Sequence, residues 1–279
     1  MMEQTANRGD TVIRRKLQGV SDTLFIPLAA RIFVSKKFPE YFFDEKALLL
    51  EKYIPDDSIQ KRSSEYSLMA SAARYRNLDS TVRAFIKKNG KSNIVYPGAG
   101  FETACYRINE PEATFYEVDL PDVVAARRMI LGEQPNERLI AGDMFGMEWA
   151  AQIDKSAATL LVVSGVFQYF KEDKVIRFVN DVKQAFSNVE LIFDATDRTG
   201  IKYANRYVRK TGNTDALMYF YVDDSTEFAG RTGTELIEER VFFTDARKML
   251  ARKLGLYTRI AMKVVDDKKR AILVHLRVN

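Results

Sequence analysis

The stretch IVYPGAG, residues 94–100, predicts a buried strand that ends abruptly in a turn. Residues of strand-forming type lead into Pro97, and Gly98 and Gly100 follow at once. Glycine has no Cβ, so such a turn lets the backbone pass close to a bound molecule. In open α/β sheets, ligands bind beyond the carboxyl ends of the strands. The turn is therefore a candidate binding site, although glycine turns also follow strands that bind nothing.

Short strand-like runs alternate with helical stretches through the middle of the chain. Such alternation predicts a parallel sheet covered by helices. TLLVVS is apolar on both faces, which is typical of a central strand. The runs are NIVYP (93–97), TFYEVD (114–119), RLIAGD (138–143), TLLVVS (159–164) and ELIFDA (190–195).

The two ends of the chain differ from this middle part. The first 90 residues indicate helices, and Gly90 is a helix stop. Residues 256–265 and 270–279 are interpreted as two antiparallel strands joined across DDKK. Five parallel strands closed by a C-terminal antiparallel hairpin predict the mostly parallel, seven-stranded sheet of a Rossmann-like class I methyltransferase. A plain dinucleotide-binding fold would end in further βα units.

A chain of 279 residues, 46% of them hydrophobic, can bury a full core as one large domain or as two small ones. The continuous α/β pattern predicts one α/β domain over residues 1–279. We expect an N-terminal helical cap at 1–90. Residues 196–243 are rich in tyrosine, phenylalanine and charge, and we expect them to form an insertion over the active site.

Charge and cysteine content exclude several classes of function. The 43 basic and 38 acidic residues are spread along the chain, so we expect no nucleic-acid partner despite the net charge of +5. No apolar run approaches the roughly 18 residues that a membrane span needs, so no membrane partner is expected. The single cysteine, Cys105, excludes an internal disulfide and predicts a cytoplasmic protein.

Acidic residues follow the second and third predicted strands. Glu117 and Asp119 lie on one side of their strand, where a carboxylate can accept hydrogen bonds from the two hydroxyls of a ribose. Asp143 ends the third strand. Its carboxylate can accept a hydrogen bond from an adenine amino group there, or it can cap a helix. Position 103 is threonine rather than the third glycine of the dinucleotide fingerprint, and no P-loop is present.

The chain lacks the usual groups for strong base catalysis. Its one histidine, His275, lies in the final strand, and no Ser-His-Asp set, metal cluster or phosphoryl-transfer motif can be assembled. Methyl transfer to a carboxylate fits this inventory, because that nucleophile is already ionised at neutral pH. A phenol or alcohol acceptor would require a base.

Seven short motifs, taken together in order and spacing, resemble the leucine carboxyl methyltransferase family over the whole chain. Within that family the chain is similar to the bacterial branch of tetracenomycin-type polyketide O-methyltransferases. The motifs are GVSDTLFIPLAAR (19–31), FDEKA (43–47), AARYRNLDSTVRAFI (72–86), VYPGAGFETACYRI (95–108), FYEVDLPDVV (115–124), AGDMF (141–145) and SGVFQYF (164–170).

The resemblance implies that the cofactor is S-adenosylmethionine and assigns residues to it. Arg74 resembles the arginine that pairs with the methionyl carboxylate, and Arg76 is the near alternative. Family members commonly have an acid where SGVFQYF begins, whereas this chain has Ser164, which we expect to line the site. The other implied contacts are Gly98 and Gly100 at the first turn, Asp119 at the ribose, and Asp143 and Met144 at the adenine.

The resemblance also implies an S-adenosylmethionine-dependent O-methyltransferase that acts on a small-molecule carboxylate or a polyketide-like hydroxyl. We expect Tyr169, Tyr219 and Phe228 to line the acceptor pocket, with local packing as the other interpretation of each. The loss of an acid at Ser164 keeps open a cofactor-binding homologue without catalysis. A nucleic-acid methyltransferase is less favoured, because SGVFQYF stands where its Asn/Asp-Pro-Pro-Tyr/Phe motif would lie.

Overall fold

Seven strands form one twisted sheet in the computed structural model, which describes residues 24–54, 63–211 and 217–279. Neighbouring strands follow the order β3-β2-β1-β4-β5-β7-β6. Strands β1 to β5 are parallel, while β7 pairs antiparallel with both β5 and β6. The strands are β1 (Ser92–Pro97), β2 (Ala113–Asp119), β3 (Glu137–Ala141), β4 (Ala158–Val163), β5 (Val189–Thr196), β6 (Glu235–Val241) and β7 (Ala271–Arg277).

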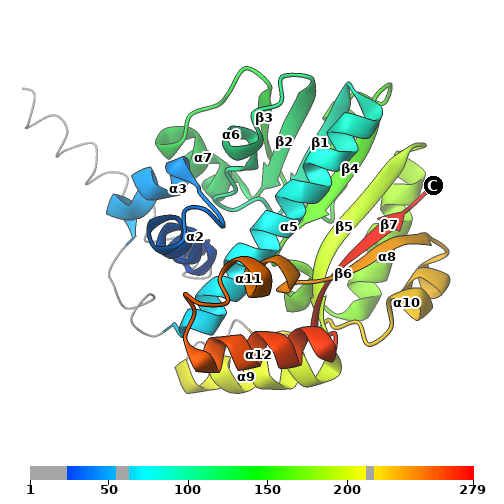
Figure 1. The fold of residues 1–279 in the computed structure, drawn as a ribbon. Coiled ribbons are helices and arrows are strands. Elements are labelled where there is room, and N and C mark those ends of the chain that lie inside the picture. Colours follow the sequence, from blue (N-terminus) through cyan, green and yellow to red (C-terminus); the bar gives the residue numbers. More distant parts are fainter. Residues whose placement is uncertain (1–23, 55–62, 212–216) are drawn as a thin grey trace, which may run out of the picture.

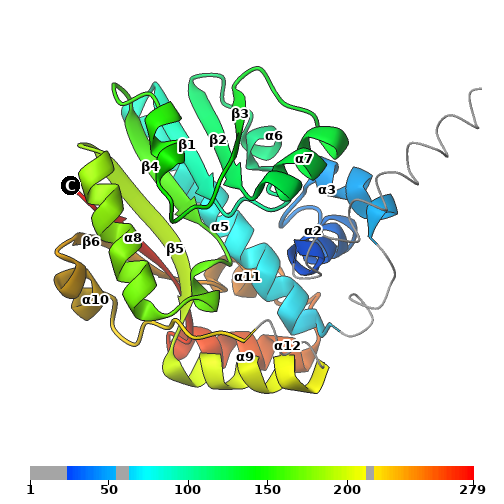
Figure 2. The ribbon, with the colours of Figure 1, turned by 180° about the vertical axis from the view of Figure 1, so that it is seen from behind.

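Helices cover both faces of this sheet (Figures 1 and 2). Alternate residues of β1 serve the two faces: Ile94 and Tyr96 pack toward α5, whereas Val95 packs toward α8. In both views α9 and α12 lie side by side. The helices are α2 (Phe25–Lys37), α3 (Glu45–Leu50), α5 (Glu65–Asn89), α6 (Ala104–Ile108), α7 (Pro121–Ile130), α8 (Glu172–Ala185), α9 (Arg198–Thr211), α10 (Ser225–Thr232), α11 (Thr244–Met249) and α12 (Leu256–Asp267).

The fold class predicted from the sequence is confirmed, including a C-terminal antiparallel pair of strands, but one strand of that pair was wrongly placed. The helices α11 and α12 lie between its two strands in the chain. Residues 256–265 belong to α12, and the edge strand that pairs with β7 is β6. The buried residues Thr258, Met262 and Asp266 recur every four residues, which is a helical period. Strand β6 has the sequence ELIEERV, whose charges suit the exposed edge of a sheet but give little strand signal. Part of the predicted insertion at 196–243 is therefore a strand of the sheet.

The single histidine lies far from the glycine turn. His275 is a buried residue of β7, and its Nε2 lies 2.9 Å from Oε2 of Glu190, at the amino-terminal end of β5. Lys88 donates to the other oxygen of that carboxylate, at 3.1 Å. In the described part of the chain, no helix is both long and apolar enough to cross a membrane.

Candidate cofactor and acceptor site

The turn after β1 has the close-packed backbone that its glycines predict. Gly98 and Gly100 have φ angles of 73° and 52°, a region that side chains other than glycine rarely adopt. A Cβ on Gly98 would lie 2.8 Å from Cγ2 of Val166, and one on Gly100 would lie 2.7 Å from Cδ2 of Leu24. A larger residue at either position would therefore displace the neighbouring side chain, so the turn requires glycine at both.

Asp119 is held beside this turn by two backbone hydrogen bonds. Its Oδ2 accepts from Gly100 N at 2.7 Å, and its Oδ1 accepts from Leu120 N at 2.7 Å. Burial raises the pKa of the carboxyl, while these two hydrogen bonds act in the opposite direction. Each oxygen still has a lone pair to offer, so the fixed carboxylate can accept from two neighbouring hydroxyls.

The end of β3 lies next to the end of β2. Gly142 N donates to the carbonyl of Asp119 at 2.9 Å. Asp143 is exposed, and its Oδ1 accepts from Phe145 N at 3.0 Å, as in an Asx-turn. The Met144 side chain is buried in the core on the α8 side of the sheet. The structure thus brings Asp143 and Met144 close to the strand end that carries Asp119.

Arg74, on α5, meets the carboxyl end of β5. Its Nη1 donates to Oδ2 of Asp194 at 3.1 Å, while Oδ1 of Asp194 accepts from Gly165 N at 2.5 Å. The Arg74 and Asp194 side chains are only 11% and 10% exposed. The buried Nε of Arg74 has no hydrogen-bond partner among the described residues. The guanidinium can therefore bind a further anionic group, because a buried donor without a partner favours a ligand that accepts its hydrogen bond.

Ser164 lies directly beside this ion pair. Because Val163 and Phe193 are paired in the parallel sheet, Ser164 and Asp194 are neighbours at the strand ends. Ser164 Oγ is buried without a hydrogen-bond partner in the described chain, and a Cβ on Gly165 would lie 2.9 Å from Nη1 of Arg74. Asp194, which was not predicted as a site residue from the sequence, thus supplies a carboxylate where Ser164 has none. Its only signal in the sequence was an acid at the end of a predicted strand.

Arg76 lies outside this site. Its guanidinium donates to the carbonyl of Tyr41, packs over the Tyr41 ring and lies 3.3 Å from Oδ2 of Asp245. The geometry therefore favours Arg74 over Arg76 as the ligand for an anion.

Two of the three predicted acceptor residues, Tyr169 and Tyr219, line one open groove with a volume of about 360 Å³. Tyr219 N donates to the carbonyl of Gln168 at 2.6 Å, and Tyr219 is 51% exposed. Burial raises the pKa of the Tyr169 hydroxyl, while a hydrogen bond with Gln168 and the nearby charge of Arg74 oppose the rise. Tyr169 thus connects the groove to the Arg74 end of the site. The rest of the lining is Phe170, Lys171, Asp173, Lys174 and Arg177.

Phe228, the third predicted acceptor residue, lies in the core. It is 3% exposed, and its ring centroid lies 5.7 Å from that of Phe193 and 5.6 Å from that of Phe220. This aromatic cluster packs between α10 and the sheet. Its position is that of a packing residue rather than of a wall of the groove.

We expect Phe228→Ala to lower the free energy of unfolding by about 3–5 kcal/mol, because it removes a fully buried ring and leaves a cavity. Affinity for the cofactor should not change. Urea unfolding and a binding titration below the unfolding transition measure the two quantities separately. Unchanged stability with a raised acceptor KM would instead place Phe228 at the substrate.

The site can hold a ligand with an anionic group at one end and two hydroxyls at the other. Arg74 has an unsatisfied donor at the first end, Asp119 has free acceptor capacity at the second, and the glycine turn lies between them in the sheet order. These features fit S-adenosylmethionine, which carries a carboxylate and a ribose.

Comparison with known protein families gives an independent description of the chain. The model of the family described as leucine carboxyl methyltransferase matches residues 14–183. That range includes the predicted cofactor residues from Arg74 to Ser164.

The chain is also similar to the tetracenomycin polyketide synthesis O-methyltransferase TcmP of Streptomyces glaucescens. The two sequences are 23% identical over 209 residues, which cover 74% of this chain and 76% of the relative.

Solved structures share the fold. A candidate methyltransferase from Thermobifida fusca YX superposes with a TM-score of 0.60 at 17% identity, covering 89% of this chain and 93% of that one. A DUF574-family protein from Streptomyces avermitilis MA-4680 gives 0.57 at 15% identity, covering 89% and 96%. At these identities the likeness establishes the architecture of the sheet and helices.

Proposed function

Because the chain belongs to the leucine carboxyl methyltransferase family, we propose that it is an O-methyltransferase acting on a small-molecule carboxylate or polyketide-like hydroxyl. S-adenosylmethionine is its cofactor, in line with the family and the class I methyltransferase fold. One observation carries the proposal. Arg74, whose buried Nε has no partner in the described chain, and Asp119, which has free acceptor capacity, lie on opposite sides of one glycine turn.

The proposed cofactor contacts follow from the charge of each end of the site. Arg74, held by Asp194, would bind the methionyl carboxylate, because a guanidinium binds carboxylates bidentately. Asp119 would accept hydrogen bonds from the ribose hydroxyls, and Gly98 and Gly100 would let the backbone approach the cofactor. Asp143 and Met144 would contact the adenine, with Ser164 beside the methionyl end. Bound S-adenosylmethionine supplies an electrophilic methyl group on its sulfonium.

The chemistry of the site favours a carboxylate as the methyl acceptor. Such an acceptor is ionised at neutral pH, so the protein need only align it with the methyl group. The chain's one histidine lies at the opposite end of the sheet and cannot serve as a base there. The catalytic contribution we propose is therefore alignment rather than proton transfer.

The groove beside Tyr169 supports an anionic acceptor. Among the described residues, neither Lys171 nor Lys174 has an ion-pair partner, and both line the groove. The Lys174 ammonium lies 3.9 Å from the centroid of Phe145 and 4.6 Å from that of Phe170. Aromatic walls and unpaired cations together favour an aromatic compound that bears a negative charge.

The second candidate function is that of a cofactor-binding homologue without catalysis, and it is suggested by Ser164. The family acid is missing at that position, yet the Asp194 carboxylate occupies the neighbouring strand end. That neighbouring carboxylate supports the active enzyme over the inactive one.

A paired substrate panel tests the proposal. Purified protein is incubated with S-adenosylmethionine and with aromatic carboxylic acids, each matched to the phenol of the same ring. We expect S-adenosylhomocysteine to form with the acids, together with methylated products that mild alkali hydrolyses, as it does esters but not ethers. Alkali-resistant products from the phenols would shift the assignment to hydroxyl methylation.

Tyr219→Ala adds a control for the groove. This variant should raise the acceptor KM about 5- to 30-fold, since it removes an aromatic contact of about 1–2 kcal/mol. Its affinity for S-adenosylmethionine should equal that of the wild type.

For the wild-type protein, tight cofactor binding without any turnover across acids, phenols and nucleic acid would contradict the enzyme proposal and favour the inactive homologue.

A further inference from the structure

Two buried arginines hold the backbone that follows the glycine turn. Nη1 of Arg127 donates to the carbonyls of Gly100 and Glu102, at 2.9 and 2.7 Å. Nη2 of Arg31 donates to the carbonyl between them, that of Phe101, at 2.5 Å. Each arginine is 1% exposed. Three consecutive carbonyls are thus fixed by guanidinium groups from outside the turn.

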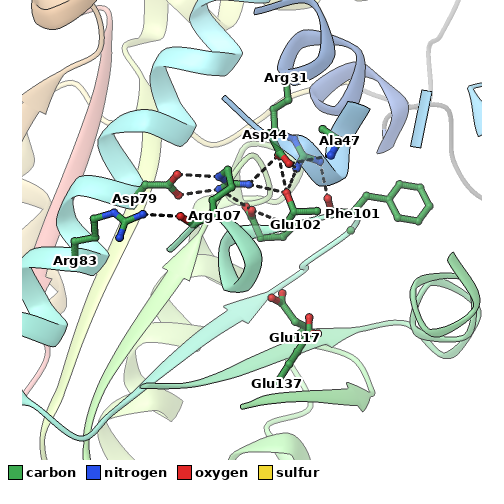
Figure 3. Close-up of polar contacts among 12 residues, drawn as sticks. Arg31, Asp44, Ala47, Asp79, Arg83, Phe101, Glu102, Arg107, Glu117 and Glu137 are labelled. Atoms are coloured by element: carbon green, nitrogen blue, oxygen red, sulfur yellow. Dashed lines mark hydrogen bonds and ion pairs between the residues drawn. The ribbon is translucent and has the colours of Figure 1, made fainter. Parts of the chain in front are cut away.

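The two arginines come from different parts of the fold. Arg127 lies on α7, and its Nη2 donates to Oε1 of Glu137 on β3 at 3.0 Å. Arg31 lies on α2, among the N-terminal helices, and its Nη1 contacts Oδ2 of Asp44 at 2.8 Å. Figure 3 shows Arg31 reaching from its helix to both Asp44 and the Phe101 carbonyl. The turn is therefore tied to the sheet side by one arginine and to the helical cap by the other.

Asp44 is shared with a second buried ion pair. Arg107 Nη1 donates to the same Oδ2 at 3.1 Å, and Arg107 forms a bidentate pair with Asp79 at 2.8 Å for each bond. Burial alone would raise the pKa of Asp44, but the charges of Arg31 and Arg107 lower it to about 2. Asp44 therefore stays charged at neutral pH and keeps Arg31 in place.

This network costs desolvation energy that an apolar core would not. What it provides is a fixed geometry for a glycine segment that is otherwise free to rotate. The Gly100 N–H is bound to Asp119 while the Gly100 carbonyl is bound to Arg127. A rotation of this peptide segment would move the Asp119 carboxylate with it.

We propose that Arg31 and Arg127 are positioning residues for the cofactor site, and that Arg31 couples the seating of α2 to the binding of S-adenosylmethionine. The inference rests on the proposed placement of the cofactor at the glycine turn. Arg74 on α5 already belongs to the proposed cofactor site, and Arg31 would make α2 a second N-terminal helix that contributes to cofactor binding. Because coupling between two equilibria is reciprocal, cofactor binding must stabilise the docked state of α2.

Conservative substitutions test the positioning role. Arg31→Lys and Arg127→Lys keep the charge but cannot hold a carboxylate and a carbonyl in the same planar arrangement. Calorimetric titration should give a Kd for S-adenosylmethionine raised by about 5- to 150-fold, the usual range of coupling, with a stoichiometry that stays near one. Partial unfolding would instead lower the stoichiometry and leave the Kd of the folded fraction unchanged.

Arg83→Lys is the matched control. Arg83 also donates to two consecutive carbonyls, those of Arg107 and Ile108, at 2.6 and 2.9 Å, but at the far end of α6. Its Kd should stay within twofold of the wild type. Asp119→Ala, run alongside, separates the two proposals: if it weakens binding while the lysine variants at 31 and 127 do not, the positioning role is overturned and the cofactor site stands. If Asp119→Ala has no effect, the site itself is wrongly placed.

Hydrogen exchange on the wild-type protein tests the coupling without any variant. Addition of S-adenosylmethionine should slow the exchange of amides in α2 as well as in the turn at 98–103. Slowed exchange in the turn with unchanged exchange in α2 would overturn the coupling through Arg31.

Discussion

The Arg74→Met variant should bind S-adenosylmethionine at least about 30-fold more weakly than the wild type. Removal of one partner from a buried, hydrogen-bonded charge pair costs about 2–5 kcal/mol, and here the ligand carboxylate would lose its partner. The same change leaves Asp194 buried next to that carboxylate, which adds repulsion between like charges. Methionine keeps the apolar length of the side chain, so packing on α5 should be preserved. Isothermal titration calorimetry measures the effect.

Arg76→Met is the control for this loss. Arg76 lies two residues away on the same helix, and its guanidinium contacts Tyr41 and Asp245 outside the site. The affinity of this variant should equal that of the wild type. Equal losses in both variants would mean a general effect on α5, and a loss only in Arg76→Met would move the carboxylate site to Arg76.

The Asp119→Asn variant should weaken S-adenosylmethionine binding by about 10- to 150-fold. A hydrogen bond to a charged group contributes about 1.5–3 kcal/mol, and the amide of asparagine offers one acceptor oxygen in place of two. The amide nitrogen would also face Gly100 N or Leu120 N, which now donate to the carboxylate. Titration of S-adenosylhomocysteine and of its 2′-deoxy analogue into both proteins locates the lost contact.

The loss should be smaller for the 2′-deoxy analogue, because one hydroxyl is already missing and the two changes are then not additive. Asp122→Asn serves as the control, since Asp122 is an exposed acid in the first turn of α7. Equal losses for the two ligands would show that Asp119 supports the turn without contacting the ribose.

The five parallel strands could be predicted because each is a short apolar run between polar helical stretches. TLLVV (159–163), for example, is buried on both faces as part of β4. The helix before β1 ends at Gly90, as its sequence indicates, because Gly90 has a positive φ of 66°.

The predicted C-terminal hairpin shows where local pattern fails. LYTRIAMKVV contains β-branched and apolar residues that suit either a strand or a helix. Its helical period becomes visible only from the positions that are buried in the fold. Strand β6 becomes a strand through pairing with β7, although its own sequence, ELIEERV, is mostly charged.

The residues of the proposed site that lie at strand ends could be selected from the sequence, whereas the arginines behind them could not. Acids and glycines at strand ends have a fixed place in an open sheet, so Asp119 and Gly98 could be selected from the sequence. Arg31 and Arg127 act through contacts with residues 101 and 100, to which no spacing in the sequence points. Such buried charges can be recognised only once the fold brings their partners together.

One titration series tests most directly whether Arg74 and Asp119 hold opposite ends of one cofactor. Methylthioadenosine, which has the ribose and adenine but no methionyl carboxylate, is titrated into wild type, Arg74→Met and Asp119→Asn beside S-adenosylhomocysteine. We expect both variants to bind S-adenosylhomocysteine weakly, whereas only Asp119→Asn should lose affinity for methylthioadenosine. If Arg74→Met weakens both ligands equally, or if the wild type binds neither, the proposed orientation of the cofactor is contradicted.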